Sequence, residues 1–457
     1  MMGPEMYGRY SLVTALAVFL ALLSGLGLTN AIGRYVPEFL HRGEAAEVRR
    51  FLGGLLTVRL FSSVAAALVY LGITVGWLRE VDSVILMTMA GVVLAQGIAQ
   101  YLFSVFLGFD RAASWGMADV LRRWLALGLV VPGFLMAGLR GATIALLVTE
   151  LILVCLGVWR GRFRPSLVDL RISPSALAPY LRFGLLFFAN AALLTACQAS
   201  GEPLVRLVSG SYAEVSYFAL ANNIFLAAAA AVSQVSLALL PLLTRLVTAG
   251  KADVATRLVD RMLTLFTIAS VIALFAAVLL GDILVQTVIG PAFAAAAVNL
   301  MPLMLTLMML GVSSVTVLLA IVYEQPNIAL RASIVRLIGF WIVGPVCVAR
   351  WGSFGACIAV LAASSAHAIL STFGLRDALG SSIRSAAAAA GTAALFLPIL
   401  WLRSTPLVNL LLFGGFVVGY AAVLLATRVI TTEEIRLVLP LVRAEPAADR
   451  AHRPRKR

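Results

Sequence analysis

Charged residues are scarce in this sequence. Asp, Glu, Lys and Arg make up 12% of the 457 residues, whereas soluble globular proteins carry roughly 25%. Apolar runs recur from end to end, and each is about 20 residues long, the length that an α-helix needs to cross a membrane. The ~10-residue alternating segments of a membrane β-barrel do not occur. The composition therefore predicts an all-α polytopic membrane protein with about 13 transmembrane helices.

Histidine and cysteine are also rare. The three histidines are dispersed, and the four cysteines lie inside apolar runs without metal-site or redox spacing. The sequence contains no phosphate-binding loop, zinc-protease motif, nucleophile elbow or dinucleotide fingerprint. The external connections are short, which argues against a membrane polymerase or ligase of glycans. We expect a carrier rather than an enzyme, with no catalytic residue, metal or cofactor.

The positive charge follows the membrane topology. The net charge is +14, and 28 of the 35 Lys and Arg residues fall in alternate connections and in the tail. Cytoplasmic loops of membrane proteins show this bias. The C-terminus is therefore predicted to be cytoplasmic and the N-terminus external, and no nucleic-acid partner is expected.

The chain resembles itself at two nearly equal offsets. An offset of 207 residues places Gly3 on Gly210 and Gly43 on Gly250, and an offset of 214 places Arg122 on Arg336 and Gly141 on Gly355. Parallel repeats around a midplane site are a plan used by transporters. The pattern predicts an N-terminal lobe with five helices, a C-terminal lobe with six, two extra helices and a basic cytoplasmic tail, at residues 1–181, 182–380, 381–427 and 428–457.

The apolar segment at residues 183–200 opens the second copy, and its counterpart would lie ahead of the first residue. We expect from this that the first lobe lacks one helix. The expectation extends to an in-frame upstream extension that encodes about 20 apolar residues.

Six segments of the chain resemble polysaccharide biosynthesis proteins. They are GPEMYGRY with the following GLGLTNAIGRYVPEFLHRGE, LRFGLLFFANAALL, SGSYAEVSYFALANNI, PLLTRLVTAGKADVATRLVDRML and TTEEIRLVLPLV. This family belongs to the multidrug/oligosaccharidyl-lipid/polysaccharide (MOP) exporter superfamily.

The resemblance implies a two-lobed flippase of the bacterial inner membrane. Such a protein moves a polyprenyl-diphosphate-linked oligosaccharide of O-antigen, capsule or exopolysaccharide across the membrane by alternating access. Membrane lipids, a glycan polymerase and a chain-length regulator are the candidate partners. The sequence departs from the family in the absent first helix and at Glu202 and Pro203, where the family usually has Asp followed by Arg or Lys.

Polar residues at membrane depth are costly unless they face a cavity or a partner. They are therefore our candidates for a cargo-binding cavity: Arg34, Arg59, Glu150, Asn190, Gln198, Glu202, Arg206 and Asn222.

Each candidate has a structural alternative. Arg34 and Arg59 would bind diphosphate oxygens, or Arg59 would reach the membrane interface. Glu150 would couple transport to an ion, or pair with an arginine of a neighbouring helix. Glu202 and Arg206, four residues apart, predict a helical ion pair that is either structural or an outer gate. The amides would contact glycan or hydrogen-bond between helices.

Three other functions compete with a lipid-linked oligosaccharide flippase. A cation or drug antiporter would place several carboxylates at membrane depth, where Glu150 is nearly alone. A membrane-embedded glycan polymerase or glycosyltransferase conflicts with the short external connections. A transport-inactive scaffold of a glycan-assembly complex is compatible with an incomplete first lobe.

Overall fold

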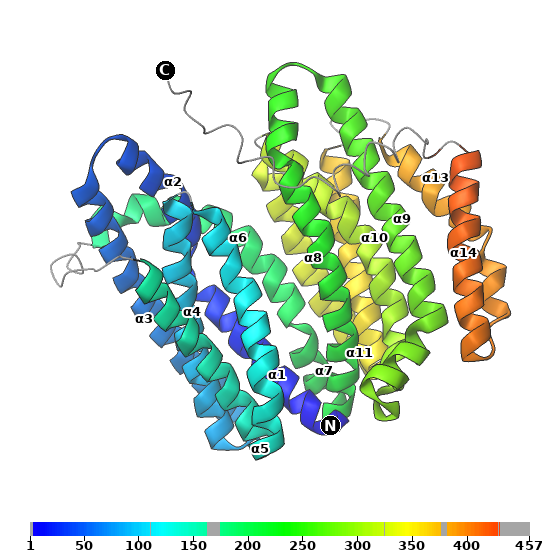
Figure 1. Ribbon diagram of the computed structural model, residues 1–457, viewed down its shortest axis with the longest axis horizontal. Helices are drawn as coiled ribbons and strands as arrows, with labels where there is room; N and C mark the ends of the chain where they lie inside the picture. The colour runs from blue at the N-terminus through cyan, green and yellow to red at the C-terminus, as the bar shows by residue number, and fades with distance from the viewer. Residues whose placement is uncertain are drawn as a thin grey trace, which may run out of the picture. The chain divides into compact units, whose positions relative to one another are not determined.

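The computed structural model describes residues 3–109, 111–161, 174–323, 325–375, 382–427 and 429. The described residues are helical almost throughout and contain no strand (Figure 1). The basic tail predicted at residues 428–457 lies, apart from residue 429, outside them. The helices are α1 (Pro4–Leu23), α2 (Leu28–His41), α3 (Ala45–Trp77), α4 (Ser83–Gly108), α5 (Ala112–Gly161), α6 (Pro174–Ala199), α7 (Gly201–Ser209), α8 (Tyr212–Thr248), α9 (Ala252–Leu284), η1 (Val285–Ile289), η2 (Pro291–Phe293), α10 (Ala295–Val322), α11 (Pro326–Gly374), α13 (Ser382–Ala394), η3 (Leu397–Trp401) and α14 (Pro406–Ala426).

Ten segments of the described chain are long and apolar enough to span a membrane. The apolar face of α3 shows how such a helix meets lipid, because large side chains spaced three, four and seven residues apart are exposed: Phe61, Val64, Leu68 and Val75. Lipid can cover such a stripe, whereas water would disfavour it. The all-helical membrane fold predicted from the composition is confirmed.

Two of the ten segments are helical hairpins. The spanning part of α5 is 46 residues long, and a straight helix of that length would measure roughly 70 Å, more than twice the hydrocarbon core. The helix breaks at Ala137 and Gly138, where Gly138 has φ 59° and ψ −139°. α11 breaks in the same way at Gly352, with φ 56° and ψ −134°. Positive φ favours glycine at both turns.

The arms of each hairpin touch through their backbones. A Cβ atom on Gly141 would collide with the carbonyl oxygen of Gly133, and one on Gly355 would collide with the carbonyl oxygen of Cys347. Residues eight apart in a straight helix would be about 12 Å apart. These contacts therefore show that each chain turns back directly.

The backbone reproduces the repeat that the sequence indicates. Gly138 and Gly352, the two hairpin breaks, are 214 residues apart, the offset found in the sequence. Gly43 and Gly250 are 207 residues apart and both have left-handed φ, at 74° and 70°. Corresponding glycines thus make corresponding turns.

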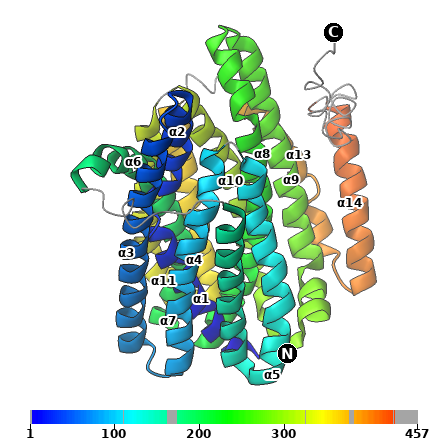
Figure 2. The ribbon, with the colours of Figure 1, turned by 60° about the vertical axis from the view of Figure 1, so that its left-hand side comes forward.

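By their internal contacts, the helices divide into two compact units. The first comprises residues 1–223 and 327–367, and the second comprises residues 224–326 and 368–457. In the first unit α4 packs against α3 on one side and α5 on another (Figure 2). The lobe boundaries expected from the repeat stay a prediction.

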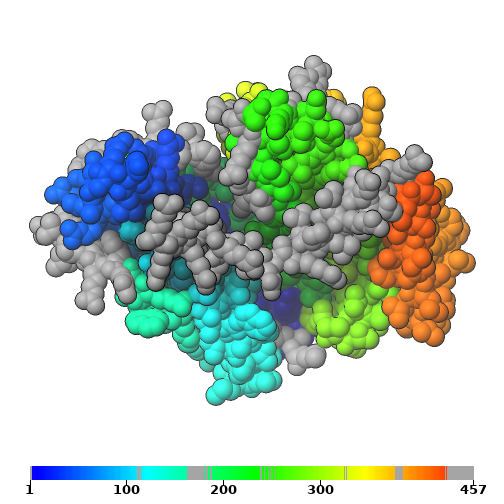
Figure 3. All heavy atoms as spheres, turned by 45° about the horizontal axis from the view of Figure 1, so that its top comes forward, coloured from blue at the N-terminus to red at the C-terminus, as the bar shows by residue number. Residues whose placement is uncertain are grey.

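An aromatic core holds the second unit together. The rings of Phe275 on α9 and Phe416 on α14 stack with centroids 3.8 Å apart. Tyr420 stacks on Phe416 at 5.4 Å and donates a hydrogen bond of 2.8 Å to the carbonyl oxygen of Ala389 on α13. This core explains why α13 and α14 pack on α9 and on each other. The outer face of α14 lies at the surface of the molecule (Figure 3).

The start of α4 is fixed by a capped N-terminus. Asp82 accepts a hydrogen bond of 3.0 Å from the backbone N–H of Val84 and another from the Arg140 guanidinium. These bonds, the Val84 bond first, hold the pKa of Asp82 below its ordinary value. Arg140 lies just after the break in α5, so the same carboxylate ties the α5 turn to the α4 start.

Candidate functional site

The helix that begins the chain breaks in the middle of its apolar run. Between α1 and α2, Leu26 and Gly27 have positive φ of 44° and 74°. A Cβ on Gly27 would collide with the backbone of Gly184 on α6, so the closest approach of these two segments requires glycine. The break leaves backbone carbonyls of α1 available to a side chain from α3.

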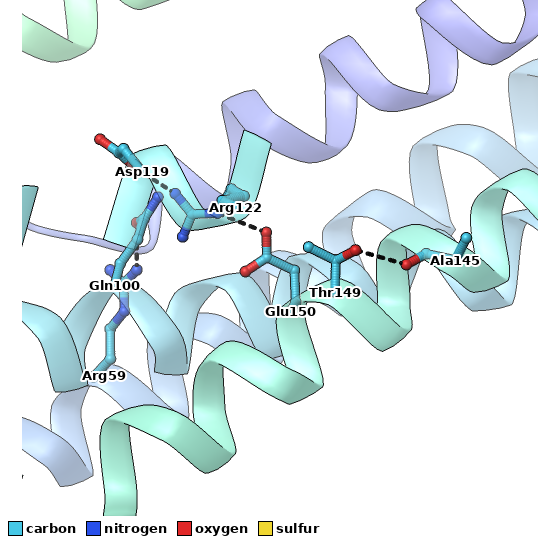
Figure 4. A network of polar contacts seen from close by, with 7 residues as sticks. All are labelled: Arg59, Gln100, Asp119, Arg122, Ala145, Thr149 and Glu150. Atoms are coloured by element: carbon cyan, nitrogen blue, oxygen red, sulfur yellow. Dashed lines mark hydrogen bonds and ion pairs between the residues drawn. The ribbon is translucent and has the colours of Figure 1, made fainter. Parts of the chain in front are cut away.

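Arg59 of α3 occupies this break. Its Nε donates to the carbonyl oxygen of Gly97 at 2.7 Å, and a terminal nitrogen donates to Oε1 of Gln100 at 3.0 Å (Figure 4). The same nitrogen approaches the carbonyl oxygen of Ala21 at 3.5 Å. The residue is 2% exposed. No carboxylate of the described residues forms an ion pair with it, so neutral oxygens alone hold this cation.

A cavity of about 140 Å³ opens beside Arg59. Its lining contains one cation, several hydrogen-bonding side chains, two aromatic rings and several apolar or glycine residues. The lining residues are Leu22, Gly25, Gly27, Leu28, Thr29, Asn30, Arg59, Gln100, Tyr101, Ser104 and Phe188. Pockets that enclose drug-sized ligands measure ~300–1,000 Å³. In this conformation the cavity therefore suits a small charged group, and Arg59, the one charged side chain among the described lining residues, favours a negative group.

Glu150 lies in a separate ion-pair network on α5. Its carboxylate accepts a hydrogen bond of 2.8 Å from Nε of Arg122, which also pairs with Asp119 at 2.6 Å (Figure 4). The Glu150 side chain is 6% exposed, and that of Arg122 is 19% exposed. Arg122 lies before the α5 break and Glu150 after it, so the pair connects the two arms. Of the two roles considered for Glu150, the geometry supports the arginine partner.

Replacing Glu150 with glutamine is expected to lower the thermal stability, because Arg122 would lose its buried partner. Removing one member of a buried pair typically costs ~3–5 kcal/mol, and we expect about 2 kcal/mol here because Asp119 remains. The check is thermal unfolding of Glu150→Gln, Arg122→Gln and the double variant in detergent, in which the double variant should lose less than the sum. Unchanged stability with lost transport would instead assign Glu150 to coupling.

The arginine at position 206 has a different partner from the one predicted. Arg206 of α7 pairs with Glu80 of the α3–α4 connection at 3.2 Å and lies 3.9 Å from the ring centroid of Tyr212. The predicted ion pair between Glu202 and Arg206 is therefore wrong. The Arg206 guanidinium binds Glu80, which is distant in the sequence, instead of Glu202. The Glu202 residue is buried, with 6% of its surface exposed.

The remaining candidates do not converge on the Arg59 cavity. Arg34 is exposed on α2, with its guanidinium 5.5 Å from the Tyr35 ring centroid. Asn190 of α6 accepts a hydrogen bond of 2.8 Å from Ser333 of α11. This contact agrees with the alternative that the amides form hydrogen bonds between helices. Gln198 is half-buried on α6, and Asn222 is buried on α8.

The sequence also contains three polar residues at membrane depth whose surroundings were missed or misjudged. Gln100, which binds Arg59, lies within an apolar span together with Gln96, four residues earlier. The rule that singled out Arg59, a polar residue at membrane depth, would have found both. Arg336 looks from the sequence like an anchor at a helix end, yet it is 3% exposed.

Comparisons with solved structures identify the architecture. The lipid II flippase MurJ in an inward closed conformation is 12% identical to this chain. The alignment covers 93% of this chain and 98% of the MurJ chain, with a TM-score of 0.66. An inward-facing multidrug resistance MATE transporter of the MOP superfamily is 16% identical. The alignment covers 84% of this chain and 92% of the transporter, with a TM-score of 0.65. A MATE transporter from Vibrio cholerae is 16% identical, with 82% and 95% coverage and a TM-score of 0.55. No curated protein sequence matches the chain.

The comparison with protein families agrees with this architecture. The sequence profile of polysaccharide biosynthesis proteins matches residues 1–247, more than half of the chain. The matched part contains Arg59, the helices that enclose its cavity and the first hairpin. The chain is a multi-span membrane protein with the fold of MOP transporters, and it belongs to the polysaccharide biosynthesis protein family.

Proposed function

We propose that the protein is a flippase for an oligosaccharide linked to a polyprenyl diphosphate. The observation that carries this proposal is the buried Arg59, which lines a cavity and has no acidic partner among the described residues. A guanidinium offers a planar set of donors that fits phosphate oxygens. A diphosphate would supply the negative charge that the surrounding protein does not.

The polar lining gives the cavity the means to orient such a group. Thr29, Asn30 and Ser104 bring hydroxyl and amide groups to the side of Arg59. Phe188 adds an apolar wall from α6. The cavity volume of about 140 Å³ is too small for a complete lipid-linked sugar. The proposal therefore assigns the diphosphate to this cavity and requires a wider conformation for the glycan.

The family and the fold support the same cargo class. The matching family takes part in polysaccharide biosynthesis, and the fold is shared with a lipid II flippase. The fold is also shared with multidrug transporters, but the carboxylate at Glu150 is already neutralised by Arg122. We further propose a location in the bacterial inner membrane with a cytoplasmic C-terminus, as the distribution of basic residues predicts.

The test is a transport assay in proteoliposomes. A polyprenyl diphosphate that carries a fluorescent sugar is distributed over both leaflets, and an impermeant quencher is added outside. The protein should bring the inner-leaflet probe within reach of the quencher, so quenching should be faster and more complete than in protein-free vesicles.

Two controls define the cargo. A fluorescent sugar on a neutral polyprenyl lipid should not be moved, because it lacks the group that Arg59 binds. A cationic dye tests the antiporter alternative in the same vesicles. Equal rates with and without protein, equal rates for the neutral probe, or transport of the dye alone would each contradict the proposal.

A further inference from the structure

The repeat places two arginines at equivalent positions with different surroundings. Arg122 and Arg336 are separated by the 214-residue offset, and both lie on the first arm of a hairpin. Arg122 pairs with Glu150 and Asp119. The same offset takes these two acids to Ser364 and Ser333. The second copy therefore contains the cation but neither carboxylate.

The second arginine is nevertheless the more deeply buried. Arg336 is 3% exposed, and its Nε–H has no hydrogen-bond partner among the described residues. It lies close enough to Cys197 of α6 and His367 of α11 to act electrostatically on both. Ser364, at the position of Glu150, is 2% exposed, and its hydroxyl also has no partner among the described residues. The positions that correspond to Arg122 and Glu150 thus carry a guanidinium N–H and a hydroxyl that have no partner among the described residues.

A buried charge without a counter-charge is costly. An isolated ion inside a protein costs far more than a buried ion pair, and the cost is offset only by an opposite charge or by complete hydrogen bonding. A thiol sulfur is a weak acceptor. No carboxylate of the described residues forms an ion pair with Arg336. Within the described part of the chain, this charge therefore has no acidic counter-charge.

We propose that Arg336 and Ser364 bind a small inorganic anion such as chloride between α6 and α11. The anion takes the place of the Glu150 carboxylate of the first copy, and it accepts from Nε of Arg336 and from the Ser364 hydroxyl. The near-complete burial of both side chains limits the ligand to a small ion. This site is distinct from the cavity at Arg59, whose lining contains no residue of α11.

The first experiment measures thermal unfolding of the purified full-length protein in chloride and in gluconate at equal ionic strength. Gluconate is too large for the site. A ligand at tenfold its dissociation constant stabilises the state that binds it, and we expect the melting temperature in chloride to be roughly 2 °C higher. Identical melting temperatures in the two salts would overturn the proposal.

A variant of the second copy assigns the effect to this site. Ser364→Glu supplies an internal carboxylate at the position of Glu150, so the chloride dependence should vanish while the protein remains folded. Arg336→Gln should also remove it, by deleting the charge. Chloride dependence that survives in either variant would place the anion elsewhere and contradict the proposal.

The first copy offers the reciprocal control. Asp119→Ser combined with Glu150→Ser recreates the surroundings of Arg336 around Arg122, and this variant should gain additional chloride dependence. The wild-type protein crystallised from bromide provides a direct measurement, because bromide is located by its anomalous scattering. A bromide peak within hydrogen-bond distance of Arg336 and Ser364 is expected, and its absence would overturn the proposal even if the variants failed to fold.

Discussion

Replacing Arg59 with glutamine is expected to remove most of the transport of a diphosphate-linked substrate. Glutamine keeps a hydrogen-bond donor of similar shape but loses the charge that the cavity offers to a phosphate. Hydrogen bonds to charged groups contribute ~1.5–3 kcal/mol each, which corresponds to roughly 10- to 150-fold weaker substrate binding. The measurement is the initial rate of quenching in the vesicle assay as a function of probe concentration.

Two further variants separate charge, geometry and folding. Arg59→Lys should fall between glutamine and the wild type, because lysine keeps the charge but not the planar set of donors. Arg42→Gln removes a positive charge from an exposed pair with Glu38 on α2 and should transport normally. Wild-type rates for Arg59→Gln at normal protein levels would show that this cavity does not bind the cargo.

Alanine at Gly141 or Gly355 is expected to prevent correct folding. In each case the new methyl group would collide with a backbone carbonyl of the opposite hairpin arm, and the arms would have to separate. Overpacking a core typically costs ~1–3 kcal/mol, and we expect about 3 kcal/mol or more because a backbone cannot rotate away as a side chain can. The measurements are the yield of monodisperse protein after detergent extraction and its melting temperature.

Each of these variants has a control on the opposite arm of the same hairpin. A methyl group added at Gly128 on α5 or at Gly339 on α11 would have no neighbouring atom within 4 Å. Alanine at either should be tolerated or slightly stabilising, by ~0.5–1 kcal/mol for a helix interior. If Gly141→Ala and Gly128→Ala behave alike, the close contact between the arms does not contribute to stability.

Much of the fold follows directly from the sequence. Runs of about 20 apolar residues require helices in a membrane, because every backbone group must be hydrogen-bonded within the segment. The repeat was detectable because turns at Gly43 and Gly250 need positive φ, which keeps glycine at both positions. Local rules of this kind depend on the chain near each residue and on the solvent, so a sequence is enough to apply them.

The candidate site was only partly predictable, because its geometry depends on contacts between distant segments. Arg59 stood out as a charge within an apolar span, but its partners Gly97 and Gln100 come from α4. Arg206 pairs with Glu80 rather than with Glu202, although Glu202 lies one helical turn away. Helical spacing shows which side chains share a face, whereas tertiary packing decides what covers that face.

The direct turns of α5 and α11 have a consequence for how the protein is made. At Gly138 and Gly352 the chain reverses within one or two residues, so almost no length of chain separates the two arms while they enter the lipid. We expect the two arms of each hairpin to enter the bilayer together, so that a polar residue in one arm also makes the insertion of the other less favourable. We expect the pairing of Arg122 with Glu150 to favour this insertion, since it neutralises two charges on opposite arms of the same hairpin.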